Sequence, residues 1–190
     1  ASAKAKRQQK TKKEPKQRKA GRPKGSKNRN KSEVTLTPEL VRIQAMIKQF
    51  LGLVGSTITL TYIALDGHFG NNNALQMVRQ CGLHLISKLR YDAALYFSYE
   101  GDNKRKKYGD KIDYRRILGR YLQETTIVDG IRTDIYQATM RHKEFAQALN
   151  VVIIVKTKLA TGATARVILF SSDLTLNWAQ LIDYLSLIHI

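Results

Sequence analysis

The side chain best suited to chemistry is the carboxylate of Asp66, which opens the stretch Asp-Gly-His-Phe-Gly over residues 66–70. It follows the apolar residues 62–65, which predict a strand covered on both faces of a sheet. Open α/β sheets bind their ligands beyond the carboxyl ends of their strands. A carboxylate there suits Mg²⁺ or Mn²⁺, which prefer oxygen ligands. An Asp before Gly is also a common turn former, so position alone leaves both interpretations open.

Four other side chains are weaker candidates for chemistry. His68 follows the strand closely enough to contact a metal or a phosphate, but a structural imidazole is the commoner role. Cys81 is the only cysteine, which excludes an intrachain disulfide, and its place at a helix end predicts packing. Glu144 and Asp173 stand in no metal-binding motif, and Asp173 is expected to cap the last helix.

The basic residues indicate a polyanionic partner. The 190 residues contain 33 Lys and Arg against 15 Asp and Glu, a net charge of +18. Residues 1–32 carry 14 of the basic residues and one acidic residue, so this segment has a charge of +13. Its charge and its lack of large apolar groups predict disorder in the free state. In the remaining +5 portion, Lys88, Arg90 and Lys156 are candidate phosphate contacts on electrostatic grounds.

Residues 21–27 (Gly-Arg-Pro-Lys-Gly-Ser-Lys) resemble the core of an AT-hook. In such a core, Pro and Gly keep the backbone slim and extended, so that Arg enters the narrow minor groove of A·T-rich DNA. The resemblance makes Arg22, Lys24 and Lys27 candidate DNA-binding residues. The same composition also suits a solvated linker between folded parts, and this alternative stays open.

The chain before residue 90 is expected to contain two helices and two strands. Their signals are a Thr-Pro-Glu helix start at 37–39, glycines at 52 and 55 that end this helix, a β-branched run over 57–66, Asn caps at 71–73, Gly82 as the next helix end, and a strand over 83–89. The last four signals describe a strand–helix–strand unit. Such units have parallel strands and a right-handed crossover.

The second half of the chain is expected to be mostly β structure. Its signals are frequent turns and many Tyr residues over 91–149, strong strands over 150–156 and 166–172 joined by a hairpin at 160–163, and a helix after 173–175. The longest apolar runs, such as residues 151–155, are far shorter than the roughly 18 residues of a membrane span. No membrane association is therefore expected.

Several stretches together resemble the DDE transposases of bacterial insertion sequences. Residues 62–72 (Tyr-Ile-Ala-Leu-Asp-Gly-His-Phe-Gly-Asn-Asn) are similar to the segment around the second catalytic Asp, and residues 83–90 to the strand that follows it. The Tyr-rich basic stretch after residue 90 is similar to the β-strand insertion of that family. Residues 170–174 (Phe-Ser-Ser-Asp-Leu) look like the strand end before the helix that carries the catalytic Glu.

The resemblance implies an α/β fold with a partial RNase H-like core, made of a βαβ unit, two further strands and a helix. It implies five segments: a disordered basic linker (1–32), a first part of the core (33–90), a β-rich insertion (91–149), a second part of the core (150–184) and a terminal segment (185–190).

The resemblance also implies an enzyme that cuts and joins DNA at the terminal repeats of an insertion sequence. Two Mg²⁺ or Mn²⁺ ions would serve the reaction, with Asp66 as a metal ligand. The implied partners are double-stranded DNA and a second copy of the enzyme, because two element ends must be brought together. The implied location is the bacterial cytoplasm, at the nucleoid.

The sequence departs from the family's pattern at both ends. The first catalytic Asp should end an earlier strand, yet no strand is predicted before residue 33. The catalytic Glu should follow on the last helix, but Tyr184 is followed by Leu-Ser-Leu-Ile-His-Ile, which can be encoded by a DNA sequence that resembles the mosaic-end adapter of sequencing libraries. We therefore expect residues 185–190 to be non-native, the natural protein to continue past residue 184, and this polypeptide alone to be inactive.

Two other functions remain open from the sequence. The first is a non-catalytic basic DNA-binding protein with an AT-hook-like tail on a degenerate nuclease core. The second is an RNA-binding or ribosome-associated protein, which the basic tail alone would allow. The α/β body disfavours the second, because it carries no single-strand-binding signature.

Overall fold

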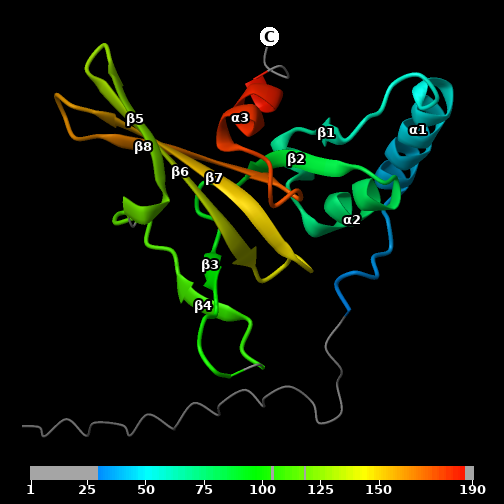
Figure 1. Cartoon of the computed structure of the whole chain (residues 1–190), viewed down its shortest axis with the longest axis horizontal. Helices are drawn as coiled ribbons and strands as arrows, with labels where there is room; N and C mark the ends of the chain where they lie inside the picture. The colour runs from blue at the N-terminus through cyan, green and yellow to red at the C-terminus, as the bar shows by residue number, and fades with distance from the viewer. Residues whose placement is uncertain (1–29, 104, 118, 187–190) are drawn as a thin grey trace, which may run out of the picture.

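The computed structural model describes residues 30–103, 105–117 and 119–186, which form a mixed α/β fold around one multi-stranded sheet (Figure 1). In these residues the helices are α1 (Pro38–Val54), α2 (Asn72–Gln80) and α3 (Trp178–Ser186), with the short 3₁₀ helices η1 (Gly67–Phe69) and η2 (Gly119–Tyr121). The strands are β1 (Tyr62–Ala64), β2 (His84–Leu89), β3 (Leu95–Ser98), β4 (Tyr108–Lys111), β5 (Leu122–Val128), β6 (Ile131–His142), β7 (Ala148–Lys158) and β8 (Thr164–Ser171). The predicted α/β class is confirmed.

Helix α1 begins where the Thr-Pro-Glu signal predicts. The hydroxyl of Thr37 accepts a hydrogen bond from the backbone N–H of Leu40 at 3.4 Å, which satisfies one of the donors that a helix start leaves open. Gly52 lies inside the helix and does not end it, because one glycine costs a helix only about 1 kcal/mol. The helix ends before Gly55, whose N–H donates to the carbonyl of Leu51.

The predicted strand–helix–strand unit is present, with β1 and β2 parallel and α2 between them along the chain. The side-chain oxygen of Asn71 caps α2 by accepting from the N–H of Ala74 at 3.0 Å. The chain then turns at Gly82, whose φ of +77° favours glycine, and enters β2. Local cap and turn residues are therefore enough to define this unit.

Strand β1 is shorter than the β-branched run over residues 57–66 predicts. The N–H groups of Thr57 and Ile58 donate to the carbonyl of Val54, at 2.9 and 2.8 Å, so this part of the run continues the turn after α1. Strand pairing starts only at Tyr62, opposite His84. β1 also lies at one end of the strand order and is half-buried. Ile63 nevertheless packs against the apolar cluster on one face of the sheet, and Tyr62 and Ala64 pack against the cluster on the other, so β1 is covered on both faces as expected.

The sheet has the strand order β1-β2-β8-β7-β6-β3-β4, and β5 pairs with β6 outside this path. β7 and β8 form the predicted antiparallel hairpin, with Asn150 opposite Ser171 and Thr157 opposite Thr164. Strands β3 to β6 come from residues 91–149, where β structure was expected, and they join the same sheet as the other strands. The division of the chain into core and insertion stays a prediction.

Two apolar clusters cover opposite faces of the sheet, because alternate residues of a strand point to opposite sides. One cluster contains Leu85 of β2 and Phe170 of β8, together with buried residues of α1 and α2. The other contains the neighbouring residues Ile86 and Leu169, together with Leu181 of α3. Helices α1 and α2 thus cover one face near β1 and β2, and α3 covers the other (Figure 1).

The helices of the described residues are short. The longest, α1, has 17 residues, and no described helix has the length and apolar character that crossing a bilayer requires. Helix α3 includes Leu185, which is buried, and Ser186. Both belong to the segment 185–190 that is expected to be non-native, and this expectation stays a prediction.

Candidate active site

Asp66 lies two residues after the end of β1, in the turn that leads through η1 to α2. Its backbone carbonyl accepts hydrogen bonds from the Ser87 hydroxyl and from the Phe69 N–H, both at 2.9 Å. Ser87 is fully buried in β2, so its bond ties the turn to the sheet. The Asp66 side chain itself is exposed. The fold therefore fixes the backbone of Asp66 and leaves its carboxylate accessible.

The turn after Asp66 packs closely against Lys88 of β2. A Cβ atom on Gly70 would lie 1.9 Å from the carbonyl oxygen of Lys88, and one on Gly67 would lie 3.4 Å from Lys88 Cβ. The absence of a side chain at Gly70 is what allows the backbone to approach the strand so closely. The structure thereby brings Lys88, one of the predicted phosphate contacts, beside the Asp66 turn.

The two other predicted phosphate contacts lie at different places in the sheet. Arg90 follows β2 and forms an exposed ion pair with Asp92, with Nε and Oδ1 3.2 Å apart. Lys156 is exposed on β7, which β2 and β8 separate from β1. The strand register aligns Lys88 with Val152, and Lys156 lies four residues beyond Val152 along β7. The structure does not bring Lys156 to Asp66.

The predicted DNA contacts of the N-terminal tail are Arg22, Lys24 and Lys27. They lie outside the described residues, together with the AT-hook-like stretch 21–27.

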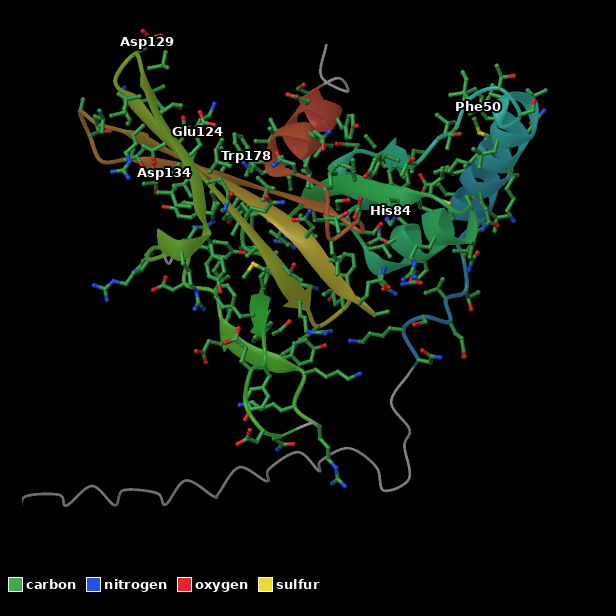
Figure 2. The ribbon with its side chains drawn as sticks, viewed as in Figure 1. Phe50, His84, Glu124, Asp129, Asp134 and Trp178 are labelled. Carbon is green, nitrogen blue, oxygen red and sulfur yellow. The ribbon has the colours of Figure 1, made fainter. Side chains whose placement is uncertain are left out.

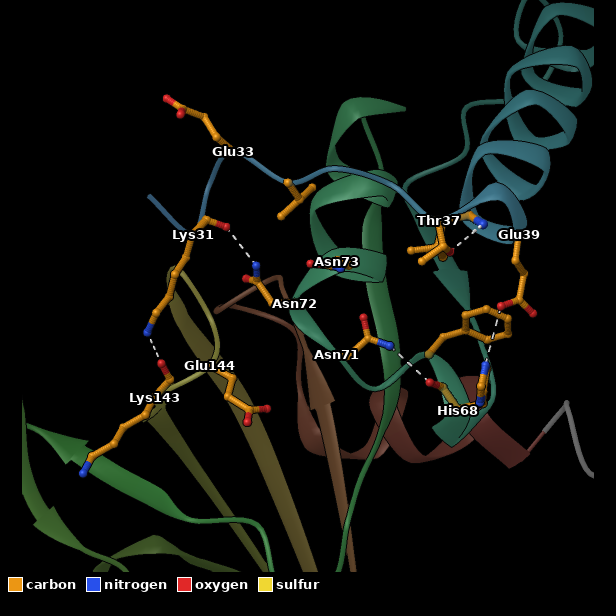
Figure 3. Close-up of a pocket in the computed structure, with 13 residues that line it drawn as sticks. Lys31, Glu33, Thr37, Glu39, His68, Asn71, Asn72, Asn73, Lys143 and Glu144 are labelled. Atoms are coloured by element: carbon orange, nitrogen blue, oxygen red, sulfur yellow. Dashed lines mark hydrogen bonds and ion pairs between the residues drawn. The ribbon is translucent and has the colours of Figure 1, made fainter. Parts of the chain in front are cut away.

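An open cleft of about 660 Å³ lies beside the Asp66 turn, between η1, the N-terminal ends of α1 and α2, and the β6–β7 connection (Figure 3). In this cleft His68 Nε2 lies 3.7 Å from Glu39 Oε2, and both side chains are exposed. The His68 ring also meets the Phe69 ring edge-on, with centroids 5.0 Å apart. His68 is therefore a surface link between η1 and α1, and not a buried imidazole.

The expected role of Asp173 as the cap of the last helix was wrong. Asn177 caps α3 instead, and its side-chain oxygen accepts from the N–H of Ala179 at 2.8 Å. Asp173 accepts from the Tyr62 hydroxyl at 2.6 Å through Oδ2, and from the Thr175 N–H at 2.9 Å through Oδ1. Asp173 thus joins β1 to the loop before α3, a contact between residues 111 positions apart.

This contact shifts the pKa values of both groups. The hydrogen bond to Asp173, with burial, raises the pKa of Tyr62 to about 12. Burial alone would raise the pKa of Asp173, but the hydrogen bonds from Tyr62 and Thr175 outweigh it, so the pKa of Asp173 is lowered. The stabilisation from Asp173 is therefore complete above pH 3.8 and is lost as the pH falls below it. The stabilisation from Tyr62 is complete below pH 10.0 and is lost as the pH rises toward 12.

Replacing Tyr62 with Phe is expected to lower the free energy of unfolding by about 1 kcal/mol at pH 7, because Asp173 loses a donor in a partly buried position. Urea unfolding at pH 7 and pH 3 measures the effect, and the difference from the wild type should shrink at pH 3. Tyr108→Phe, on the distant β4, is the matched control and should change neither value. An equal loss at both pH values would contradict the role given to the carboxylate.

The described residues contain no group of three or more His, Cys, Asp or Glu side chains that could hold a metal ion. Asp66 accordingly belongs to no such group within the part of the chain that the structure describes. Sequence reasoning missed the Tyr62–Asp173 contact, because its two halves lie in different elements and no local pattern connects them.

The chain matches the model of a known protein family. A family model described as DDE superfamily endonuclease matches residues 4–146, which include β1, the Asp66 turn and β2. Among curated proteins, no match was found.

Proposed function

The chain belongs to the family of DDE superfamily endonucleases, and from that membership we propose that it acts in cutting and joining DNA at the ends of an insertion sequence. The observation that carries the proposal is Asp66, an exposed carboxylate on a firmly held turn at the carboxyl end of β1, within the matched residues. The family is one of nucleases, which act on DNA and generally use divalent metal ions.

The carboxylate of Asp66 is a suitable oxygen ligand for Mg²⁺ or Mn²⁺. A pair of such ions, however, needs more than one carboxylate. Since the described residues hold no cluster of three or more His, Cys, Asp or Glu side chains, they do not fit a pair of ions on their own. We infer that Asp66 supplies one ligand of a two-metal site, and that carboxylates outside the described residues complete it.

The outer edge of β1 supports this inference. Within the described residues β1 pairs only with β2, so its other edge is open to a further strand. A strand added there in parallel would end beside Asp66, because parallel strands end at the same edge of a sheet. In this proposal β1, α2, β2, β7, β8 and α3 form part of an RNase H-like core.

The proposed partners follow from charge and from the reaction. Residues 1–32 carry a charge of +13 and would bind the phosphates of double-stranded DNA near the element's terminal repeats. Joining two element ends requires two active sites, so we propose a homodimer. A bacterial nucleoid location belongs to the same proposal.

Purified residues 1–190 are expected to show no Mg²⁺- or Mn²⁺-dependent nicking of supercoiled DNA above background, because one carboxylate does not hold a metal pair. Gel analysis of plasmid topology measures this directly. Nicking that requires metal and disappears in Asp66→Ala would show that the chain carries a complete site.

The alternative function is a non-catalytic DNA-binding protein, which fits the finding that no metal-binding cluster lies within the described residues. The DNA around the source locus separates the two functions. An open reading frame that adds an upstream Asp and a downstream Glu-bearing helix, between inverted repeats, supports the endonuclease. An in-frame stop codon after Ile190 at a locus without repeats supports the binding protein.

A further inference from the structure

A second cleft, of about 770 Å³, lies where β6, β7 and β8 pass the loop that follows β2. This volume is in the range of pockets that hold small molecules. Tyr136 and Val155 in its lining also pack against the α1–α2 cluster, so the cleft opens on that face of the sheet. It combines planar side chains, positive charge and one buried carboxylate. Each of these three features would contact a different part of a bound molecule.

The walls of the cleft are flat and fixed. The Arg166 guanidinium lies over the Tyr114 ring, 4.4 Å from its centroid, and 5.7 Å from the centroid of the Tyr91 ring. Arg166 Nε donates to the Tyr91 carbonyl at 2.6 Å, and the Tyr114 hydroxyl donates to the Ala93 carbonyl at 2.6 Å. The Tyr91 side chain is largely exposed, at 63%. Aromatic rings and guanidinium planes of this kind stack on nucleobases.

The carboxylate of the cleft belongs to Asp134, which is only 7% exposed and still lines the cleft. It accepts from the Thr125 hydroxyl at 2.6 Å and from Arg132 Nε at 2.9 Å. Both bonds end on Oδ1, so they orient the carboxylate and use only part of its acceptor capacity, since a carboxylate can accept about four bonds.

This set of groups matches one base better than the others. Guanine presents two adjacent donors, N1–H and N2–H, which a carboxylate accepts side by side, and two acceptors, O6 and N7, which Arg recognises. Asp134 offers the acceptors, and Arg115 and Arg166 offer the donors. Thymine has a single N–H that lies between two carbonyl oxygens. These oxygens would face the carboxylate oxygens, which repel them. We propose that this cleft binds an unpaired guanine base.

Tyr91 of the cleft and the Asp66 turn both lie beyond the carboxyl ends of neighbouring strands. Tyr91 follows Lys88 by three residues, beyond the carboxyl end of β2, and Asp66 lies beyond the carboxyl end of the parallel strand β1. An unpaired guanine near a cleaved DNA end would therefore lie at the same edge of the sheet as Asp66. The idea that the guanine comes from a cleaved DNA end rests on the proposed function. The recognition of guanine by the cleft does not depend on that function.

The test uses residues 1–190 and fluorescence anisotropy of DNA hairpins that differ in one unpaired 3′ base. Salt is raised until the phosphate contacts of the basic tail are weak. We expect the guanine hairpin to bind about tenfold more tightly than the thymine hairpin, as one bidentate base contact provides. Equal affinity for all four bases would overturn the proposal.

Asp134→Asn should reduce the guanine preference to twofold or less, because the amide places a donor where guanine also has donors. Asp129→Asn is the matched control: it removes the same charge at the tip of the β5–β6 hairpin, where a φ of +50° suits Asn, away from Asp134 (Figure 2). The control should keep the full preference. A preference that survives Asp134→Asn would refute recognition by this carboxylate.

A second pair of variants does not disturb the buried carboxylate. Tyr91→Ala should weaken binding of the guanine hairpin about tenfold, and Tyr91→Phe should leave it unchanged, because the ring and not the hydroxyl stacks. Equal affinities of the two variants would count against the cleft.

Competition with dGMP and dAMP identifies the source of the base. Displacement of the hairpin by dGMP alone supports a site that also takes free guanine nucleotides. Guanine preference in the hairpins without displacement supports a site for DNA ends. These binding measurements need neither metal nor cleavage. The absence of a guanine preference would therefore not contradict the proposed endonuclease function, and the absence of cleavage would not contradict guanine binding.

Discussion

Asp66→Asn is expected to lower Mg²⁺-dependent DNA cleavage by about a thousandfold, measured in the polypeptide encoded by the full reading frame of the source locus. Replacing the carboxylate with an amide removes a negatively charged metal ligand. The lost stabilisation of transition-state charge is several kcal/mol, and about 4 kcal/mol corresponds to a thousandfold in rate. The free energy of unfolding should stay within about 0.5 kcal/mol of the wild type, because the side chain is exposed and the bonds that Asp66 makes to described residues end on its backbone carbonyl.

Asp92→Asn is the matched control for this measurement. Asp92 is also an exposed carboxylate in a loop that follows a strand, and its ion pair with Arg90 is at the surface. Exposed pairs contribute little, so the control should keep cleavage and stability close to the wild type. Equal cleavage by wild type and Asp66→Asn would remove Asp66 from the metal site and with it the main support for the endonuclease proposal.

The parts of the fold that the sequence predicts well are those with local causes. Thr37 and Pro38 define the start of α1, and Asn71 and Gly82 bound α2, because each acts on a neighbouring backbone group. The β7–β8 hairpin follows from two apolar runs and a turn between them. The position of Asp66 beyond a strand end was predictable for the same reason.

Features with distant causes were not predictable from local patterns. The run over residues 57–66 has strand composition, but composition does not show which residues find a partner strand, and pairing starts only at Tyr62. Asp173 has the local appearance of a helix cap, yet its carboxylate bonds to Tyr62 and Thr175. Lys156 shares its charge type with Lys88, but its distance from Asp66 depends on the order of four strands.

The second large effect is expected at Gly70, whose backbone approach to β2 holds the Asp66 turn in place. Gly70→Ala should lower the free energy of unfolding by about 3 kcal/mol, at the upper end of typical overpacking costs. The added Cβ would lie 1.9 Å from the Lys88 carbonyl oxygen, which is backbone and has no rotamer to move away. The turn must then shift from β2, which also strains the bond from Ser87 to the Asp66 carbonyl.

Urea unfolding measures this prediction, with Gly52→Ala as the matched control. Gly52 lies inside α1, and a Cβ there would meet no atom within 4 Å, so the same substitution should stabilise the protein by about 0.5–1 kcal/mol. The free energy of unfolding should thus fall in Gly70→Ala and rise in Gly52→Ala. This difference separates the effect of the close approach at Gly70 from the general effect of glycine on the entropy of the unfolded chain. Since Asp66 is held through the same turn, Gly70→Ala should also reduce cleavage in the full reading frame while leaving every carboxylate in the chain intact. A Gly70→Ala protein as stable as the wild type would show that the turn accommodates a side chain, and that the position of Asp66 does not depend on this contact.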